Sequence, residues 1–153
     1  MPIPADLKEI SYTDFTFDMD YTESIIIDES LPSLLYNYYN LDPNWYAESN
    51  VNRILILEPS VFKKYPVSKK NIDFAIKLAK ANIPSIQIFI GEFDSLKANH
   101  AIRNFIYKEH PLNNYEGTEE ARDWMFSIEG YFPSFFSFWK KCRKERSRFK
   151  NQV

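Results

Sequence analysis

Arg53-Ile54-Leu55-Ile56-Leu57-Glu58 holds an unbroken apolar run of strand length, and Pro59 closes it. Such a run, without alternating polar residues, is typical of a strand that is buried on both faces of a parallel sheet. Ser68 offers an N-cap for a helix over residues 69–81, where apolar residues recur at helical spacing. Ile86-Gln87-Ile88-Phe89-Ile90 has the composition of the next strand. Strand, helix and strand in this order predict a βαβ unit.

The segments on either side continue this pattern less regularly. The predicted elements are a strand or extended segment over 24–28, a helix over 31–39, a short helix over 94–103, a strand over 104–108, a loop over 112–118, a helical stretch opened by Thr118, and a terminal helix over 133–144. This alternation of strands and helices predicts an α/β three-layer sandwich with a mostly parallel, Rossmann-like sheet.

The length of 153 residues suits a single α/β domain over 1–153, with an N-terminal arm over 1–23 and a basic, frayed tail over 143–153. Hydrophobic residues make up 44% of the chain, which is enough for a packed core and excludes a disordered protein. No apolar run approaches the ~18 residues of a membrane span, and the N-terminus lacks the pattern of a secretory signal. The single cysteine, Cys142, excludes an internal disulfide. We therefore expect a cytoplasmic protein without a membrane partner.

Charge is distributed unevenly along the chain. Residues 1–50 contain ten acids and one base, whereas residues 140–150 contain seven bases and one acid. The basic tail supplies candidate phosphate contacts at Lys140, Lys141, Arg143 and Lys144, which would make a nucleic acid a possible partner. A solvated helix end, where cations suit the helix dipole, is the interpretation we prefer. The tail would otherwise contact the acidic head of its own or another copy.

The glycine content excludes two common nucleotide-binding loops. Gly91, Gly117 and Gly130 are the only glycines, and no two lie close together in the sequence. Loops that cradle phosphates need clustered glycines, so that backbone amides can approach the anion. Neither a Walker A loop nor a dinucleotide fingerprint is present. Nucleophilic catalysis also lacks a motif, and Cys142 is interpreted as a residue on one face of the terminal helix.

Acidic residues follow the predicted strands. Ligands of open parallel sheets bind outside the carboxyl ends of the strands, where converging carboxylates and an imidazole would hold a cation or act as acid and base. The candidate ligand or metal edge consists of Asp28, Glu58, Glu92, Glu109 and His110. The interpretation we favour is that these strand ends simply enter solvent, so no catalytic residue and no metal ligand is assigned.

An aromatic block over 124–139 is the most unusual stretch of the chain. Roughly two-thirds of its rings are expected to cover one face of the sheet. The remaining rings would dock on a partner or stack on bases. The candidate interface residues are Trp124, Tyr131, Phe135, Phe136, Phe138 and Trp139.

Seven short blocks occur in an order that matches a known family. The blocks are Leu31–Leu34, Asn40–Trp45, Asn52–Ser60, Lys64–Ser68, Lys108–Pro111, Arg122–Trp124 and Gly130–Lys141. Together they resemble the C-terminal α/β portion of bacterial photolyase/cryptochrome-related proteins that carry an FAD-binding domain. The likeness spans residues 30–142.

The resemblance implies an accessory α/β domain, analogous to the α/β antenna domain of photolyases. In that family the flavin sits in a separate all-helical domain, for which this chain has no room. We therefore carry over no FAD-binding residue and expect no cofactor in this chain. The first hypothesis is a non-catalytic module that docks on a helical flavin-binding partner or on a second copy. A small metal-dependent hydrolase and a nucleic-acid-binding accessory protein are the alternatives.

Overall fold

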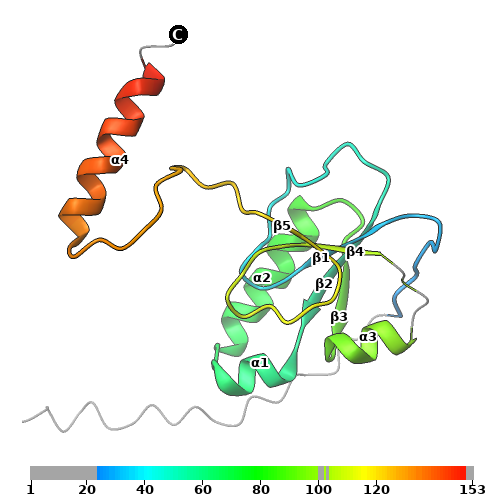
Figure 1. The fold of residues 1–153 in the computed structure, drawn as a ribbon. Coiled ribbons are helices and arrows are strands. Elements are labelled where there is room, and N and C mark those ends of the chain that lie inside the picture. Colours follow the sequence, from blue (N-terminus) through cyan, green and yellow to red (C-terminus); the bar gives the residue numbers. More distant parts are fainter. Residues whose placement is uncertain (1–23, 100–101, 103, 151–153) are drawn as a thin grey trace, which may run out of the picture. The chain divides into compact units, whose positions relative to one another are not determined.

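The computed structural model describes residues 24–99, 102 and 104–150. The chain divides into two compact units, Met1–Glu120 and Ala121–Val153. The elements, labelled in Figure 1, are β1 (Ser33–Tyr36), β2 (Asn52–Leu57), α1 (Pro59–Lys64), α2 (Lys69–Asn82), β3 (Gln87–Ile90), α3 (Phe93–Asn99), β4 (Phe105–Lys108), β5 (Thr118–Glu120) and α4 (Phe135–Lys150). No helix in the described ranges combines the length and apolar character needed to cross a membrane.

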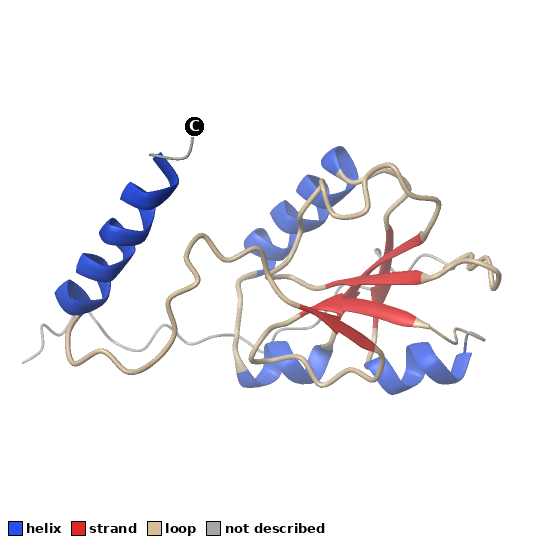
Figure 2. Ribbon diagram, turned by 45° about the horizontal axis from the view of Figure 1, so that its top comes forward, coloured by secondary structure: helices blue, strands red, loops and turns tan. Residues whose placement is uncertain are grey.

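The first unit is built on a five-stranded sheet in the order β3-β2-β1-β4-β5, with every neighbouring pair parallel. Helices lie on both sides of the sheet (Figure 2). Adjacent residues of a strand point to opposite faces, and the core divides accordingly. Leu34 joins Ile76 of α2 in one cluster, whereas Leu35 joins Leu96 of α3 in the other. The predicted three-layer, Rossmann-like α/β fold is confirmed.

The predicted βαβ unit is formed by β2, α2 and β3. All six residues of β2 are buried, as a strand covered on both faces requires. The Ser68 hydroxyl accepts a hydrogen bond from the Asn71 amide at 3.3 Å and caps α2. The predicted apolar stripe of α2 supplies its buried residues, which include Ile72 and Ala79.

The central strand β1 stands where a helix over 31–39 was predicted, and that prediction is wrong. All four residues of β1 are buried. The hydroxyl of Tyr36 donates to the Trp45 carbonyl oxygen at 3.2 Å inside the core. A short apolar run does not by itself distinguish a buried strand from a buried helix. The parallel partners β2 and β4 on its two sides supply the backbone hydrogen bonds that decide between them.

Residues 24–28 belong to no strand, because side chains rather than a strand ladder hold their backbone. The Gln87 side-chain amide accepts from the Ile26 amide at 2.6 Å and donates to its carbonyl at 2.8 Å. The Asn52 side chain makes the same exchange with the backbone of Asp28, at 3.0 and 2.9 Å. These bonds fix the segment beside β2 and β3.

Two further elements differ from the predictions. β5 replaces the helical stretch predicted to open at Thr118, because residues 118–120 pair with β4. Short, charged strands are common at sheet edges. α3 begins at Phe93, one residue before the predicted start at residue 94, since the Glu92 carbonyl accepts the first helical hydrogen bonds. The rest of the predicted 94–103 helix is confirmed only to Asn99, and residues 100–101 and 103 lie outside the described residues.

Helix α4 of the second unit begins two residues later than predicted and ends later. Ser134 and Ser137 exchange side-chain hydrogen bonds with each other's backbone amides at 3.3 and 3.4 Å, as in a capping box. The helix continues to Lys150, so residues 143–150 of the expected frayed tail are helical.

Candidate functional site

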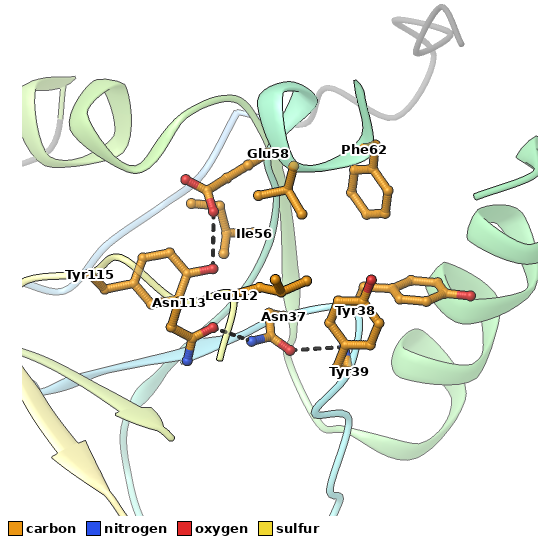
Figure 3. A pocket seen from close by; sticks show the side chains of 10 residues that line it. Asn37, Tyr38, Tyr39, Ile56, Glu58, Phe62, Leu112, Asn113 and Tyr115 are labelled. Atoms are coloured by element: carbon orange, nitrogen blue, oxygen red, sulfur yellow. Dashed lines mark hydrogen bonds between the residues drawn. The ribbon is translucent and has the colours of Figure 1, made fainter. Parts of the chain in front are cut away.

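The strand order creates a switch point between β1 and β4. From β1 the chain adds β2 and β3 on one side, and β4 then returns to the other side of β1. Ligands of open parallel sheets bind outside the carboxyl ends of the strands at such a point. Here the segments after β1 and β4 meet Glu58 at the end of β2 and line a hollow (Figure 3).

Hydrogen bonds connect the segments that line this hollow. The Asn37 side-chain amide donates to the Asn113 side-chain oxygen at 2.7 Å, and its own oxygen accepts from the Tyr39 amide at 2.8 Å. Asn113 also donates to the Lys108 carbonyl at 2.7 Å. The remaining space is about 20 Å³, which is room for about one water molecule. The hollow is therefore a small notch with a mainly apolar lining rather than a cavity for a larger ligand.

Among the residues that the structure describes, Glu58 is the one acid that lines this notch, and two donors hold it there. The Tyr115 hydroxyl donates to its carboxylate at 3.1 Å, and the Phe93 amide donates at 3.2 Å. Figure 3 shows the Glu58 and Tyr115 side chains pointing toward each other across the notch. The carboxylate therefore links the end of β2 to the start of α3 and to the loop between β4 and β5.

The electrostatics of this pair follow from burial. Desolvation raises the pKa of Glu58, and the nearby charges of Glu92 and Asp94 add to that effect against its two hydrogen bonds. Burial and the neighbouring Glu58 carboxylate raise the pKa of Tyr115 far above its ordinary range, so its hydroxyl stays a donor. A carboxyl group with a raised pKa in a notch is a candidate acid or base.

Three other predicted residues lie at this carboxyl edge, each with partners of its own. Glu92 accepts from the Ser60 amide at 2.9 Å and from its hydroxyl at 2.7 Å. His110 stacks on Tyr39 with ring centroids 4.6 Å apart, and its Nδ1 accepts from the Leu112 amide at 3.2 Å. The Glu109 amide continues the pairing of β4 with β5.

Asp28 does not lie with them, contrary to expectation. It sits beside Asn52, the first residue of β2, and therefore at the amino edge of the sheet. No group of three or more His, Cys, Asp or Glu side chains suited to a metal ion occurs in the part of the chain that the structure describes. The acids that the sequence places after the strands are thus spread over separate local contacts.

The second unit folds residues 126–132 along one face of α4. Phe132 packs edge-on against Phe138, with ring centroids 5.3 Å apart. Ser127 donates to the Glu145 carboxylate from its amide at 3.0 Å and from its hydroxyl at 2.6 Å. Cys142 lies on the same helix face and is buried.

Six large apolar side chains of the aromatic block are exposed. Phe135 and Trp139 stack on each other on α4, with centroids 6.3 Å apart and planes at 10°. The exposed apolar face, as we name this set, consists of Trp124, Met125, Tyr131, Phe135, Phe136 and Trp139. Five of the six predicted interface residues belong to it, and the sixth, Phe138, is partly buried. None of these rings is fully buried within the second unit.

The predicted phosphate contacts on α4 are also exposed. Lys140, Lys141, Arg143 and Lys144 all face solvent, and the Lys141 ammonium lies 4.8 Å from the centre of the Phe132 ring. The one acid of this helix, Glu145, is engaged by Ser127 within the unit. The exposed charge of α4 through residue 147 is therefore entirely positive.

Sequence reasoning missed Tyr115, Asn37 and Asn113, which complete the notch. All three lie in loops, and none belongs to a recognisable motif. The one available signal was their position shortly after an apolar segment. That signal becomes useful only when the strand order is known.

No family model, no curated protein and no solved structure matches this chain.

Proposed function

We propose that this protein is a non-catalytic accessory α/β module, acting in the cytoplasm, that docks on a partner protein through its second unit. The observation that carries the proposal is the exposed apolar face. Exposure in this set ranges from 40% for Trp139 to 90% for Tyr131. Large apolar side chains that a protein leaves exposed, such as the contacting rings of Phe135, Phe136 and Trp139, are typical of an interaction site.

The carboxyl edge of the sheet supports an accessory rather than a catalytic role. Glu58 accepts hydrogen bonds from the Tyr115 hydroxyl and from the Phe93 amide, which belong to the fold itself. The adjoining notch has room for about one water molecule. The Glu58 carboxylate and its two donors therefore serve to hold segments of the fold together, and the notch beside them is small.

The partner we propose is a helical flavin-binding protein, as the resemblance to photolyase/cryptochrome-related proteins implies. Such a partner would carry the flavin, and this chain would supply a docking surface. Aromatic side chains suit that role, because they bury a large area at a small cost in side-chain entropy. The stacked pair Phe135 and Trp139 presents such a surface on one helix.

Affinity capture of the tagged protein from its native cells tests the proposal. Flavin released from the eluate is measured by its fluorescence. Wild type is compared with the double variant Tyr131→Ala, Phe136→Ala, which removes two of the most exposed side chains. Phe74→Ala is the matched control, because Phe74 is 66% exposed but lies on α2 of the first unit.

We expect flavin to elute with wild type and with the Phe74 variant, and to be reduced at least tenfold with the double variant. The buried thiol of Cys142 checks that the second unit of the double variant is intact, because unfolding would expose it to thiol reagents. Flavin-free eluates from wild type, or equal flavin from the double variant, would contradict the proposal.

A second candidate function rests on the exposed cations of α4. Lysines and arginines next to exposed rings suit a single-stranded nucleic acid, whose phosphates and bases they would contact. Fluorescence anisotropy with a labelled single-stranded oligonucleotide tests this candidate. The variant Lys140→Gln, Lys144→Gln should weaken binding and flatten its salt dependence, whereas the control Lys70→Gln, Lys77→Gln on α2 should not.

A further inference from the structure

The boundary between the two units is also a boundary in charge. Met1–Glu120 contains 18 acidic and 11 basic residues, a net charge of −7, whereas Ala121–Val153 contains 3 acidic and 8 basic residues, a net charge of +5. Opposite charges on two parts of one chain attract those parts in different copies. The near-neutral total of −2 conceals this polarity.

The negative charge of the first unit is concentrated near the start of the chain. Residues 6–23 contain six acids and one base. Four apolar residues, Phe15, Phe17, Met19 and Tyr21, recur at every second position among these acids. This segment therefore offers carboxylates and large apolar side chains together.

The surface of α4 offers the complementary chemistry in the same combination. Its first turns carry the exposed rings of Phe135, Phe136 and Trp139, and its later turns carry exposed lysines and arginines. Glu145 does not offset the exposed positive charge of α4, because its carboxylate accepts hydrogen bonds from Ser127 within the second unit. Rings can pack against rings while cations pair with carboxylates beside them.

We infer that copies of this chain associate head to tail, with residues 6–23 of one copy bound to the exposed face of α4 in another. This rests on the proposed function, in which the second unit is the docking surface. In a closed dimer, residues 6–23 of each copy would bind α4 of the other copy, so that both α4 surfaces are covered. Self-association and docking on another protein would then compete for the same rings.

Sedimentation of the purified full-length protein tests this inference. At low ionic strength we expect a mass of at least two chains. At about 1 M salt, where the Debye length falls to about 3 Å, we expect a shift toward one chain. A single-chain mass at low salt and high protein concentration would overturn the inference.

Charge reversal makes the test specific. The head variant replaces Asp14, Asp18, Asp20 and Glu23 with Lys, which gives residues 6–23 a net charge of +3. The tail variant replaces Lys140, Arg143, Lys144 and Arg146 with Glu, which gives residues 140–150 a net charge of −2. Each variant alone should sediment as one chain at low salt, because its head and tail then carry like charge. Mixed in equal amounts, the two variants should associate again, since each head now meets a tail of opposite charge.

The control variant Lys70→Glu, Lys77→Glu reverses two exposed charges on α2 and should leave the wild-type mass unchanged. Protection of Cys142 from thiol reagents confirms that the tail variant keeps its second unit. Association that survives either reversal, or a mixture that stays monomeric, would overturn the head-to-tail arrangement. Neither result bears on the flavin measured after affinity capture, so failure of this inference and failure of the proposed function are separable.

Discussion

The Tyr115 hydroxyl donates a hydrogen bond to the Glu58 carboxylate across 3.1 Å, and thereby fastens the loop between β4 and β5 to the end of β2. The Phe93 amide adds a second bond from the start of α3. These bonds favour the charged carboxylate, but desolvation outweighs them and raises the pKa of Glu58 above its ordinary value of 4.5. In its charged form at neutral pH, the Glu58 carboxylate therefore lowers the free energy of unfolding, although it links the segments at the carboxyl edge.

This destabilisation by the charged carboxylate leads to the first prediction, for Glu58→Gln. A carboxyl group with a pKa raised by folding binds its proton more tightly in the folded state, so its contribution to stability falls as pH rises from 4.5 through the raised value. Glutamine keeps an acceptor oxygen and carries no charge. We expect the free energy of unfolding of the variant to gain on wild type as pH rises from 4 to 7 in urea titrations. Parallel curves for variant and wild type would contradict this.

Glu120 gives the second prediction, with the opposite sign. Partial burial acts to raise its pKa, but hydrogen bonds from Trp45 at 3.0 Å and Tyr46 at 2.7 Å, together with Lys108, lower it. A lowered pKa stabilises the fold above pH 4.5, and this contribution is lost as pH falls through the folded value. Glu120→Gln should therefore destabilise the protein by about 1 kcal/mol at pH 7. The loss should shrink toward pH 3, and the exposed variant Glu48→Gln serves as the control in the same titrations.

The sequence was most informative between residues 52 and 90, where periodicity is long enough to be decisive. The buried stripe of α2 covers about two turns, from Ile72 to Ala79, and the six residues of β2 are all buried. β1 and β5 have only four and three residues, which is too short for any period to show. Their assignment depends on neighbouring strands that are distant in sequence, so local patterns alone do not reveal it.

The candidate site shows the same limit. Glu58 and Glu92 were predicted at the carboxyl edge, because each lies within two residues of the end of a strand that the sequence reveals. Tyr115 reaches Glu58 only because β4 lies next to β1, an adjacency that strand order determines. Asp28 was misplaced because its segment ends at the side chain of Asn52 instead of forming a strand.

The third prediction concerns β1, the element that the sequence misassigned. Leu35 is 1% exposed and belongs to the cluster on the α3 side of the sheet. Leu35→Ala should lower the free energy of unfolding by about 2–5 kcal/mol, because it leaves a cavity at the centre of the sheet. The exposed control Phe74→Ala should stay within about 0.5 kcal/mol of wild type. Urea midpoints measure both, and a cost below about 1 kcal/mol for Leu35→Ala would argue against a central β1.

The last prediction uses Cys142 to report on the second unit. The buried thiol should react slowly with a thiol reagent in buffer and rapidly in urea. Ser127→Ala removes the 2.6 Å hydroxyl bond to Glu145, which holds residues 126–132 along α4. Losing about 1 kcal/mol from this tie should speed the reaction about fivefold, since local opening exposes the thiol.

Ser147→Ala is the matched control, because the Ser147 hydroxyl bonds only within α4, to the Arg143 carbonyl at 2.9 Å. Its thiol should react at the wild-type rate. Rapid labelling of wild type in buffer would mean that the inner face of α4 is open in solution. The rings of Phe132 and Phe138 would then be exposed as well, and the second unit would present no fixed surface for a partner.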